Sequence, residues 1–310
     1  MRRPSLAGHA SVPGMSGKDW SRLVALSVLW GGSFFFIGAA RPELPALTIV
    51  AARLALGAAA LWLVLPRLGI APPRGLSAWL ACAGMGVLNN AIPFSLIAWA
   101  QGSLASGLAS VLNATTPMMT VLAAHVLTSD EKITRAKLAG VGLGFAGVAV
   151  LAGPDAFTGR TDSLPILAML AATFSYGLSG VFGRRFRRLP MAPEAGALGQ
   201  LTASALIMVL PALLLDRPWT LSPGPVALGA VVGLGLLSTA LAYILFFRVL
   251  VSAGPTNLSL ATFMIPPTAI LLGVAFLGET LQARHIAGIA LIAAGLVVID
   301  GRLLRLRALA

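Results

Sequence analysis

Long apolar segments, separated by short polar or glycine- and proline-containing stretches, recur along almost the whole chain. Each has close to the roughly 20 residues that an α-helix needs to cross about 30 Å of hydrocarbon. Runs of this length predict membrane-spanning helices. We expect ten spans, at residues 20–40, 45–65, 77–100, 104–127, 136–153, 164–183, 192–215, 226–250, 255–277 and 284–301.

The predicted spans divide into two sets of five, at residues 20–153 and 164–301. Because five is odd, the second set enters the bilayer from the opposite side, which gives the inverted repeats of many secondary transporters. Residues 1–19 lack an apolar run and are interpreted as a disordered cytoplasmic tail, and residues 302–310 as a short basic cytoplasmic tail. The predicted fold is an all-α integral membrane protein with two inverted five-helix repeats around a central cavity.

Single positions repeat as well. Pro117 and Pro266 are 149 residues apart, and the same offset relates Phe94 to Tyr243. The residues that follow each proline recur in the same order, as Glu131, Gly140 and Gly147 in the first half and Glu279, Gly288 and Gly295 in the second. The two halves therefore share a design that extends beyond hydropathy.

Several of these residues resemble a known family. Trp30-Gly31-Gly32-Ser33-Phe34 in the first span, Arg53 in the second and the duplicated proline, glutamate and glycine series are similar to the EamA-type repeats of the drug/metabolite transporter superfamily. The similarity covers nearly the whole chain after residue 20, and the chain looks most like the YddG-type amino-acid exporters. The resemblance implies a ten-helix secondary transporter that exports amino acids and related metabolites across the bacterial inner membrane.

Charge is sparse and unevenly placed. Charged residues make up 10% of the chain, yet the net charge is +12. If the N-terminus is cytoplasmic, most of the Lys and Arg residues fall in the cytoplasmic loops and tails, as the positive-inside rule requires. The basic excess therefore indicates topology, with both termini cytoplasmic and the lipid bilayer as the partner, and we expect no nucleic-acid partner.

Arg53 lies about eight residues into the second predicted span, and its counterpart in the second half is near Gln200. An ionisable group inside the membrane is costly and suggests function. Its guanidinium could hold a substrate carboxylate through two parallel hydrogen bonds. Alternatively, Arg53 extends to the interface or ties helices together.

Aromatic and amide residues are the second group of candidates, because flat apolar walls with a few polar groups suit apolar or aromatic substrate side chains. Trp99 is near a span end, where the interfacial aromatic belt explains it equally well. Asn89 and Asn90 either line the cavity or satisfy the backbone that Pro93 leaves unpaired. The predicted substrate-binding residues are Trp30, Phe34, Arg53, Asn89, Asn90, Trp99, Asn113, Tyr176, Gln200 and Tyr243.

Glycines and prolines within the spans are candidates for hinges or for close helix packing. The predicted gating residues are Gly31, Gly32, Pro93, Pro117, Gly177 and Pro266. The fifth and tenth spans contain glycines but almost no polar side chains, so we expect scaffold or dimer-facing helices there, in a monomer or a homodimer. We also expect Glu131 and Glu279 to cap these two helices.

Acidic residues and histidines are absent from the predicted middle of every span. Proton-driven carriers usually place such a group deep in the membrane, so we expect facilitated diffusion or exchange. The alternative is a proton-coupled exporter of drugs or other metabolites, with interfacial coupling through Glu194. An enzyme would need a nucleophile, a metal cluster or paired carboxylates, so we predict no enzyme, no metal and no cofactor. A zwitterionic amino acid fits one cation, several amides and an aromatic wall best.

Overall fold

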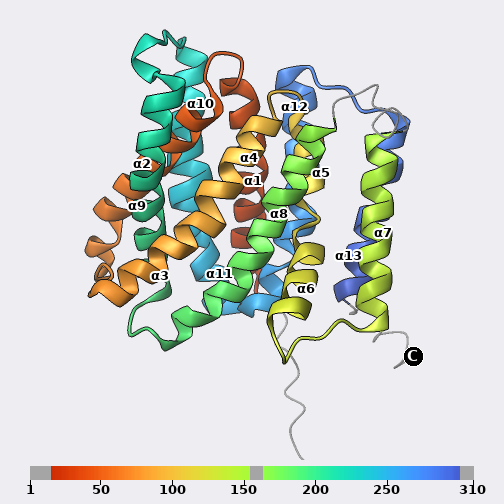
Figure 1. Ribbon diagram of the computed structural model, residues 1–310, viewed down its shortest axis with the longest axis horizontal. Coiled ribbons are helices and arrows are strands. Elements are labelled where there is room, and N and C mark those ends of the chain that lie inside the picture. The colour runs from red at the N-terminus through yellow and green to blue at the C-terminus, as the bar shows by residue number, and fades with distance from the viewer. Residues whose placement is uncertain (1–14, 154–162, 301–310) are drawn as a thin grey trace, which may run out of the picture.

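The computed structural model describes residues 15–153 and 163–300, and within these ranges it contains helices and turns but no strand. The helices run roughly side by side in one bundle (Figure 1). Nine helical segments of this part of the chain are long and apolar enough to cross a membrane, and a shorter apolar helix at Ala261–Leu277 makes the tenth. The predicted all-α membrane fold is confirmed.

Each repeat is built from helices of which some pairs together form one span. The first consists of α1 (Gly17–Ala40), α2 (Ala46–Val64), α3 (Leu76–Gly86), α4 (Ile92–Ala100), α5 (Ser106–Asn113), α6 (Thr116–Leu127) and α7 (Arg135–Ala152). The second consists of α8 (Leu164–Phe182), α9 (Pro193–Pro211), α10 (Pro225–Gly235), α11 (Ala242–Leu258), α12 (Ala261–Leu277) and α13 (Ala283–Asp300). α1 begins three residues before the predicted start of the first repeat, and Ser16 caps it. Residues 1–14 and 302–310 of the two predicted tails lie outside the described residues.

Two spans are interrupted by π-helical segments at equivalent places. One, η2 (Val87–Ala91), joins α3 to α4, and the other, η7 (Leu236–Leu241), joins α10 to α11. The offset of 149 residues that relates Pro117 to Pro266 also relates Val87 to Leu236. π-bulges are rare and occur often at functional sites. The duplication therefore extends to an irregularity of the backbone.

The fourth span is also discontinuous, because α5 ends at Asn113 and α6 begins at Thr116 after a short turn. Its counterpart in the second repeat, predicted at residues 255–277, is interrupted after Leu258, and α12 begins at Ala261. Gly254, in the left-handed region with φ of 78°, ends the preceding span. Broken helices are tolerated at membrane depth where they line a cavity or are buried in protein.

α7 and α13 pack against each other at one edge of the bundle (Figure 1). A Cβ atom on Gly140 would lie 2.7 Å from the Gly295 carbonyl oxygen, and one on Gly147 would lie 2.8 Å from that of Gly288. The glycines therefore allow the two backbones to approach each other, as small-residue faces do in membranes.

The expected capping roles of Glu131 and Glu279 are wrong. The side chain of Thr134 accepts a hydrogen bond from the Lys137 N–H and so caps α7, because Thr134 directly precedes that helix. The Glu279 carboxylate instead reaches the first repeat, where it accepts hydrogen bonds from the backbone N–H groups of Ser106 and Gly107. Glu279 thus caps α5 and not α13.

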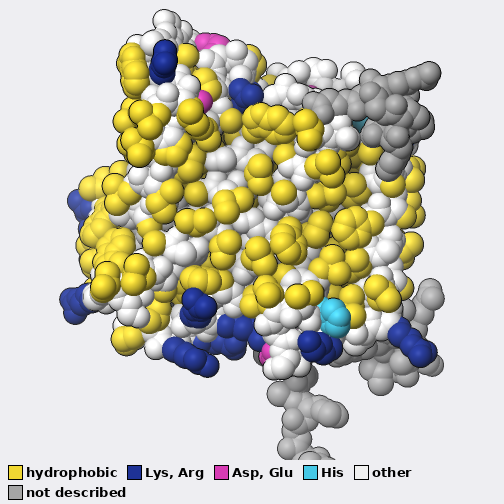
Figure 2. Space-filling model, viewed as in Figure 1, with side chains coloured by type: hydrophobic (Ala, Val, Ile, Leu, Met, Phe, Trp, Pro, Cys, Tyr) yellow, Lys and Arg dark blue, Asp and Glu magenta, His cyan; other side chains and the backbone are white. Residues whose placement is uncertain are grey.

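The surface has a wide hydrophobic band, and most of the visible basic side chains gather below it (Figure 2). We call this the basic end of the bundle; it includes the short helix η4 (Gly183–Arg188). The turn between α4 and α5, at residues 101–105, lies at the opposite end (Figure 1). This separation of charge agrees with the positive-inside pattern in the sequence.

Candidate substrate-binding cavity

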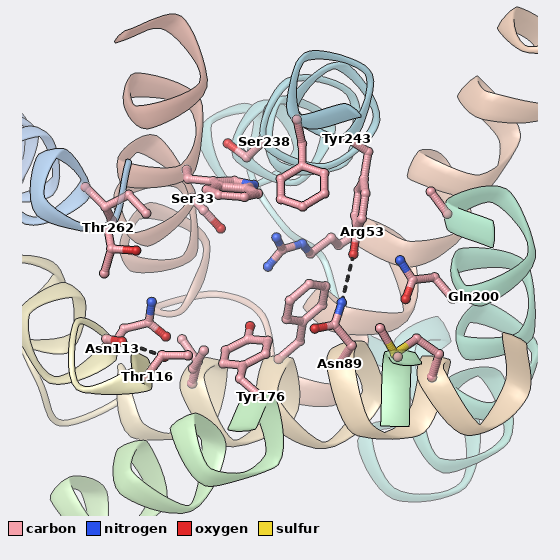
Figure 3. Close-up of a pocket in the computed structure, with 18 of the residues that line it drawn as sticks. Ser33, Arg53, Asn89, Asn113, Thr116, Tyr176, Gln200, Ser238, Tyr243 and Thr262 are labelled. Atoms are coloured by element: carbon pink, nitrogen blue, oxygen red, sulfur yellow. Dashed lines mark hydrogen bonds between the residues drawn. The ribbon is translucent and has the colours of Figure 1, made fainter. Parts of the chain in front are cut away.

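A cavity of about 570 Å³ lies between the two repeats, and its lining comes from both. Its walls are mainly apolar and aromatic, with polar groups from several helices facing inward (Figure 3). Sites for small molecules commonly have this size and composition. The cavity is lined by eight of the predicted residues: Trp30, Phe34, Arg53, Asn89, Asn113, Tyr176, Gln200 and Tyr243.

Arg53 projects from α2 into the cavity and is only 6% exposed. Its Nε donates a hydrogen bond of 2.9 Å to Thr239 Oγ1, and its Cζ lies 3.6 Å from the centroid of the Phe94 ring. Among the described residues, no carboxylate pairs with this guanidinium, and none accepts a hydrogen bond from its terminal nitrogens. Arg53 therefore joins α2 to η7 through Nε. The two terminal nitrogens of its guanidinium are left for another partner.

Thr239 lies in the π-helical segment η7 and orients Arg53. Its hydroxyl donates to the Leu234 carbonyl oxygen at 2.9 Å, so its oxygen is free to accept from Arg53. A Cβ atom on Gly57 would lie only 2.8 Å from Thr239 Cγ2. The glycine on α2 thus allows the close approach that brings the two side chains into hydrogen-bonding distance.

A neutral hydrogen-bond network supports the same wall. Asn89 Nδ2 donates to the Tyr243 hydroxyl at 3.2 Å, and this hydroxyl donates to Asn90 Oδ1 at 3.1 Å. Asn90 also donates to Ser204 Oγ at 3.0 Å and is fully buried. Asn89 lines the cavity, whereas Asn90 lies behind the wall and supports it from η2. Ser175, rather than either amide, donates to the Leu88 carbonyl oxygen near the Pro93 break.

Trp99 is not in this cavity. Its side chain is 47% exposed and lines a separate surface groove that also contains Arg41 and Leu215. A position near the end of α4, at the surface, fits the interfacial alternative that the sequence left open.

Several lining residues were missed by the sequence analysis. They include Ser33, Thr116, Ser238, Phe246, Phe247 and Thr262. Thr262 was detectable, because it lies 149 residues after Asn113, the offset that relates the two prolines. Phe246 and Phe247 form an edge-to-face pair with ring centroids 5.0 Å apart. Phenylalanines in an apolar helix carry no signal that distinguishes a cavity wall from a lipid-facing surface.

Four of the six predicted gating residues lie at close contacts or helix starts. A Cβ atom on Gly31 would lie 2.6 Å from Thr268 Cβ, and one on Gly177 would lie 2.8 Å from the Met119 carbonyl oxygen. Gly32 has ordinary contacts only. The three prolines occupy the first turns of α4 and α6 and the interior of α12. These positions fit close packing, and a role in gating stays a prediction.

The cavity extends toward the basic end, where Phe186, Pro193 and Leu250 line it. Toward the opposite end, hydrogen bonds join the surrounding helices. Gln101 Nε2 donates to the Phe34 carbonyl oxygen at 2.8 Å and to Ser106 Oγ at 3.2 Å. The cavity therefore reaches toward the basic end, whereas hydrogen bonds between helices close the opposite end. We call the opposite end the closed end.

Among the described residues, the cavity lining contains no Asp, Glu, His or Lys side chain and no Arg other than Arg53. The same residues contain no group of three His, Cys, Asp or Glu side chains placed to hold a metal ion. At the basic end, Asp130 accepts hydrogen bonds from Arg184, which holds the pKa of this carboxyl below its usual value. Arg184 also pairs with Glu131 at 2.6 Å.

Two five-helix repeats that enclose a cavity in the apolar zone are the architecture of secondary transporters. The chain belongs to the EamA-like transporter family, whose model matches residues 21–153 and 163–300. Both matched segments coincide with the two repeats. This family and the relatives below are transporters, not enzymes.

The relatives extend over most of the chain. An uncharacterised inner membrane transporter of Escherichia coli, YedA, is 27% identical over 84% of this chain and 83% of its own. A probable amino-acid metabolite efflux pump of Salmonella typhimurium is 26% identical over 92% of this chain and 95% of its own. A probable terminal-alkyne amino-acid exporter of Streptantibioticus cattleyicolor is 27% identical, with coverage of 94% and 95%. A solved crystal structure with 21% identity matches with a TM-score of 0.65, over 93% of this chain and 99% of the other, which supports the fold.

Proposed function

We propose that this membrane transporter exports amino acids from the cytoplasm across the inner membrane, and that Arg53 binds the substrate carboxylate. One observation carries the proposal. Arg53 is buried in the cavity wall, and no described residue supplies a negative charge to its guanidinium. An unpaired buried charge costs several kcal/mol, and a carboxylate bound by two hydrogen bonds offsets that cost.

The rest of the cavity fits the body of an amino acid. Its apolar and aromatic wall includes Trp30, Tyr176 and Phe246, which suit apolar and aromatic side chains. A substrate with several phosphates would need more than one buried cation, and a cationic drug would need a buried carboxylate. The described lining offers one cation and no carboxylate, and this supports a substrate with a single carboxylate.

Topology and relatives support export. If the basic end is cytoplasmic, with both termini there, the cavity as described here extends toward the cytoplasm and can load substrate from it. Two of the relatives carry names of amino-acid or amino-acid metabolite exporters. The two repeats would then alternate around the fixed site to release substrate on the other side.

The described lining contains neither a carboxylate nor a histidine, which supports transport down the substrate gradient or by exchange. In proteoliposomes without a substrate gradient, a pH difference is expected to drive no accumulation of labelled amino acid. Accumulation driven by the pH difference would instead support the proton-coupled alternative, and Glu194→Gln would test whether that coupling passes through Glu194.

The test of the carboxylate role compares efflux of labelled amino acids from proteoliposomes for the parent, Arg53→Lys and Arg53→Ala. Lysine keeps the charge but loses the fork, so we expect about a tenfold loss, and alanine about a hundredfold or greater loss. Arg67→Ala is the matched control, because that side chain lies on the surface. Efflux at the parental rate in both Arg53 variants would contradict the proposal.

A further inference from the structure

The cavity wall contains a helix break opposite Arg53. α5 ends at Asn113, and α6 begins at Thr116, so the carboxyl end of α5 lies in the wall. The last carbonyl groups of a helix carry partial negative charge and stabilise cations. In transporters, the carboxyl ends of such half-helices are used to coordinate cations. The local field at this break therefore favours a positive group.

The side chains at the break are poised to accept hydrogen bonds. Ser110 donates its hydroxyl proton to the Gly107 carbonyl oxygen at 2.6 Å, and Thr116 donates its own to the Asn113 carbonyl oxygen at 2.7 Å. Both residues border the cavity, but Ser110 is fully buried, so Thr116 is the hydroxyl available to a ligand. Because its proton is already in use, the Thr116 oxygen can only accept.

Asn113 adds a second acceptor. Its Oδ1 is buried and has no hydrogen-bond partner in the described structure, where its Nδ2 makes no hydrogen bond either. A half-turn of the amide about Cβ–Cγ exchanges the two atoms without breaking a hydrogen bond. The side chain can therefore turn its oxygen toward a donor in the cavity. An unpaired buried amide is costly, and a ligand donor would relieve that cost.

Figure 3 shows the two groups facing one space. The guanidinium of Arg53 extends into the part of the cavity that Asn113, Thr116 and Thr262 face from the other side. Donors therefore lie on one side of this space and acceptors on the other. A free amino acid carries a carboxylate and an ammonium group on one carbon, which matches this division.

We propose that the break between α5 and α6 binds the α-ammonium group of the substrate, with Asn113 as the specificity-determining acceptor. This inference rests on the proposed function and makes it narrower. It selects free α-amino acids over α-hydroxy acids and N-acylated amino acids, which keep the carboxylate but lack the ammonium group. A site built to pair a charged group rejects an analogue that leaves it unpaired.

The experiment uses leucine and its α-hydroxy analogue as competitors of labelled amino-acid efflux in proteoliposomes. The parent is expected to prefer leucine by about 10- to 100-fold, which corresponds to one or two charge-assisted hydrogen bonds. Asn113→Leu, which is similar in volume, is expected to reduce that preference to within about threefold and to leave inhibition by the hydroxy acid unchanged. Thr116→Val tests a second acceptor if Asn113→Leu fails to fold.

The outcomes separate this inference from the proposed function. Amino-acid efflux with an unchanged preference in both variants would overturn the ammonium subsite alone. An equal loss for leucine and the hydroxy acid would also overturn it, because that result indicates damage to the cavity as a whole. A parent protein that moves no amino acid would overturn the proposed function itself.

A second inference comes from carboxylates at the two ends of the bundle. At the closed end, opposite the basic end, Glu279 accepts hydrogen bonds from the N–H groups that begin α5. Glu43 accepts a hydrogen bond from the Gly224 N–H just before α10. Each contact joins one repeat to the other and caps a helix N-terminus, where a negative charge is favourable.

At the basic end, the described contacts of the equivalent glutamates are different ones. Glu131, the counterpart of Glu279, pairs with Arg184 in solvent. Glu194, within two residues of the position equivalent to Glu43, makes no hydrogen bond or ion pair with any described residue. The backbone positions these carboxylates would cap by symmetry are Thr256 and Gly75, which lie 149 residues from Gly107 and Gly224.

We infer that these glutamates are alternating latches, engaged at the closed end and released at the open end. Transport would release Glu279 and Glu43 while Glu131 and Glu194 cap their counterpart helices. The two ends are unequal, because Pro255 occupies the position equivalent to Ser106 and has no N–H to donate. The latch at the basic end has one donor fewer, which favours the state described here.

The test measures access to the cavity from each side. A cysteine placed at Ile37, which lines the cavity, is labelled with a membrane-impermeant maleimide in oriented vesicles of the Cys82→Ser protein. Glu279→Gln is expected to increase labelling from the end opposite the basic end about three- to tenfold, since a neutral amide caps a helix less well. Asp130→Asn is the control, because this neighbour of Glu131 also pairs with Arg184. Parental labelling in Glu279→Gln, or the same increase in Asp130→Asn, would overturn the latch.

Discussion

Arg53 on α2 and Gln200 on α9 occupy equivalent places in the two repeats but differ in chemistry. A Cβ atom on Gly235 would lie 3.3 Å from the Arg53 carbonyl oxygen, and one on Gly86 would lie 2.8 Å from that of Gln200. Each glycine directly precedes a π-helical segment, η7 or η2. The backbone frame is thus duplicated, while the charge is present on one side only.

This difference gives the cavity a direction. If both repeats carried the same group, a substrate could bind equally well in two orientations related by the pseudo-twofold axis. If Arg53 binds the substrate carboxylate as proposed, that carboxylate has one favoured position, and the neutral Gln200 side would receive a different part of the ligand. Gln200 Oε1 is buried and has no hydrogen-bond partner among the described residues, so that side also has unused capacity.

The largest expected effect comes from removing the difference. Arg53→Gln makes the two sides alike and removes the only cation of the described lining, so amino-acid efflux is expected to fall about a hundredfold or more. The measurement is the initial efflux rate from proteoliposomes at matched protein content.

The double variant Arg53→Gln with Gln200→Arg sharpens the comparison, because it moves the cation to the equivalent place. We expect it to regain about tenfold over Arg53→Gln alone, since the carboxylate can bind in the reversed orientation. Equal efflux in the single and double variants would show that the surroundings of the two positions, and not the charge alone, decide binding.

The next effect tests how Arg53 is oriented. Thr239→Val removes the acceptor for Arg53 Nε and keeps the volume, so we expect about a five- to tenfold rise in the KM for the amino acid, from one lost hydrogen bond. The maximal rate is expected to change less than twofold, because the charge stays in place. Thr239→Ser keeps the oxygen and is expected to retain the parental KM; a fall in maximal rate in Thr239→Val at constant KM would contradict a positioning role.

The sequence predicted the fold more completely than it predicted the contacts of the site. The span pattern and the repeated residues predicted the all-α fold, because hydrocarbon leaves the backbone few alternatives to helices. Arg53 and Tyr243 were found because a charge or a matched aromatic stands out in an apolar helix. The partner of Glu279 was not predictable, since a carboxylate in a loop can cap any helix that the tertiary fold brings near it.

The π-helical segments were not predictable from the sequence either. Asn90 and Thr239 are equivalent by the 149-residue offset, and both are fully buried behind the cavity lining, where Asn90 bonds Ser204 and Thr239 bonds Arg53. No residue pattern indicates that the helix period changes at either place, because the change depends on the packing of η2 against α9 and of η7 against α2. A one-residue shift in the period decides which side chain faces the cavity.

A smaller effect concerns the outer pair of helices, where packing rather than chemistry is duplicated. Gly147→Ala places a methyl group 2.8 Å from the Gly288 carbonyl oxygen, so we expect a loss of about 1–3 kcal/mol in stability and a lower Tm in detergent. Gly142→Ala, on the same helix with no atom within 4 Å of the new Cβ, is the control and is expected to keep or slightly raise the Tm. Equal Tm values in both variants would show that α7 and α13 can separate at little cost.

The smallest effect lies at the basic end, on the exposed pair of Arg184 and Asp130. The pair lowers the pKa of the Asp130 carboxyl in the folded protein, so its stabilising contribution is present above the ordinary pKa of aspartate and is lost as the pH falls through the lowered value. Near neutral pH, Asp130→Asn is expected to lower the Tm only slightly, because exposed pairs are screened by solvent and salt. As the pH falls through the lowered pKa of Asp130, the parent also loses the charge, and the two Tm curves should converge. A difference that grows as the pH falls would show that the Arg184 interaction does not act through the charge of this carboxylate.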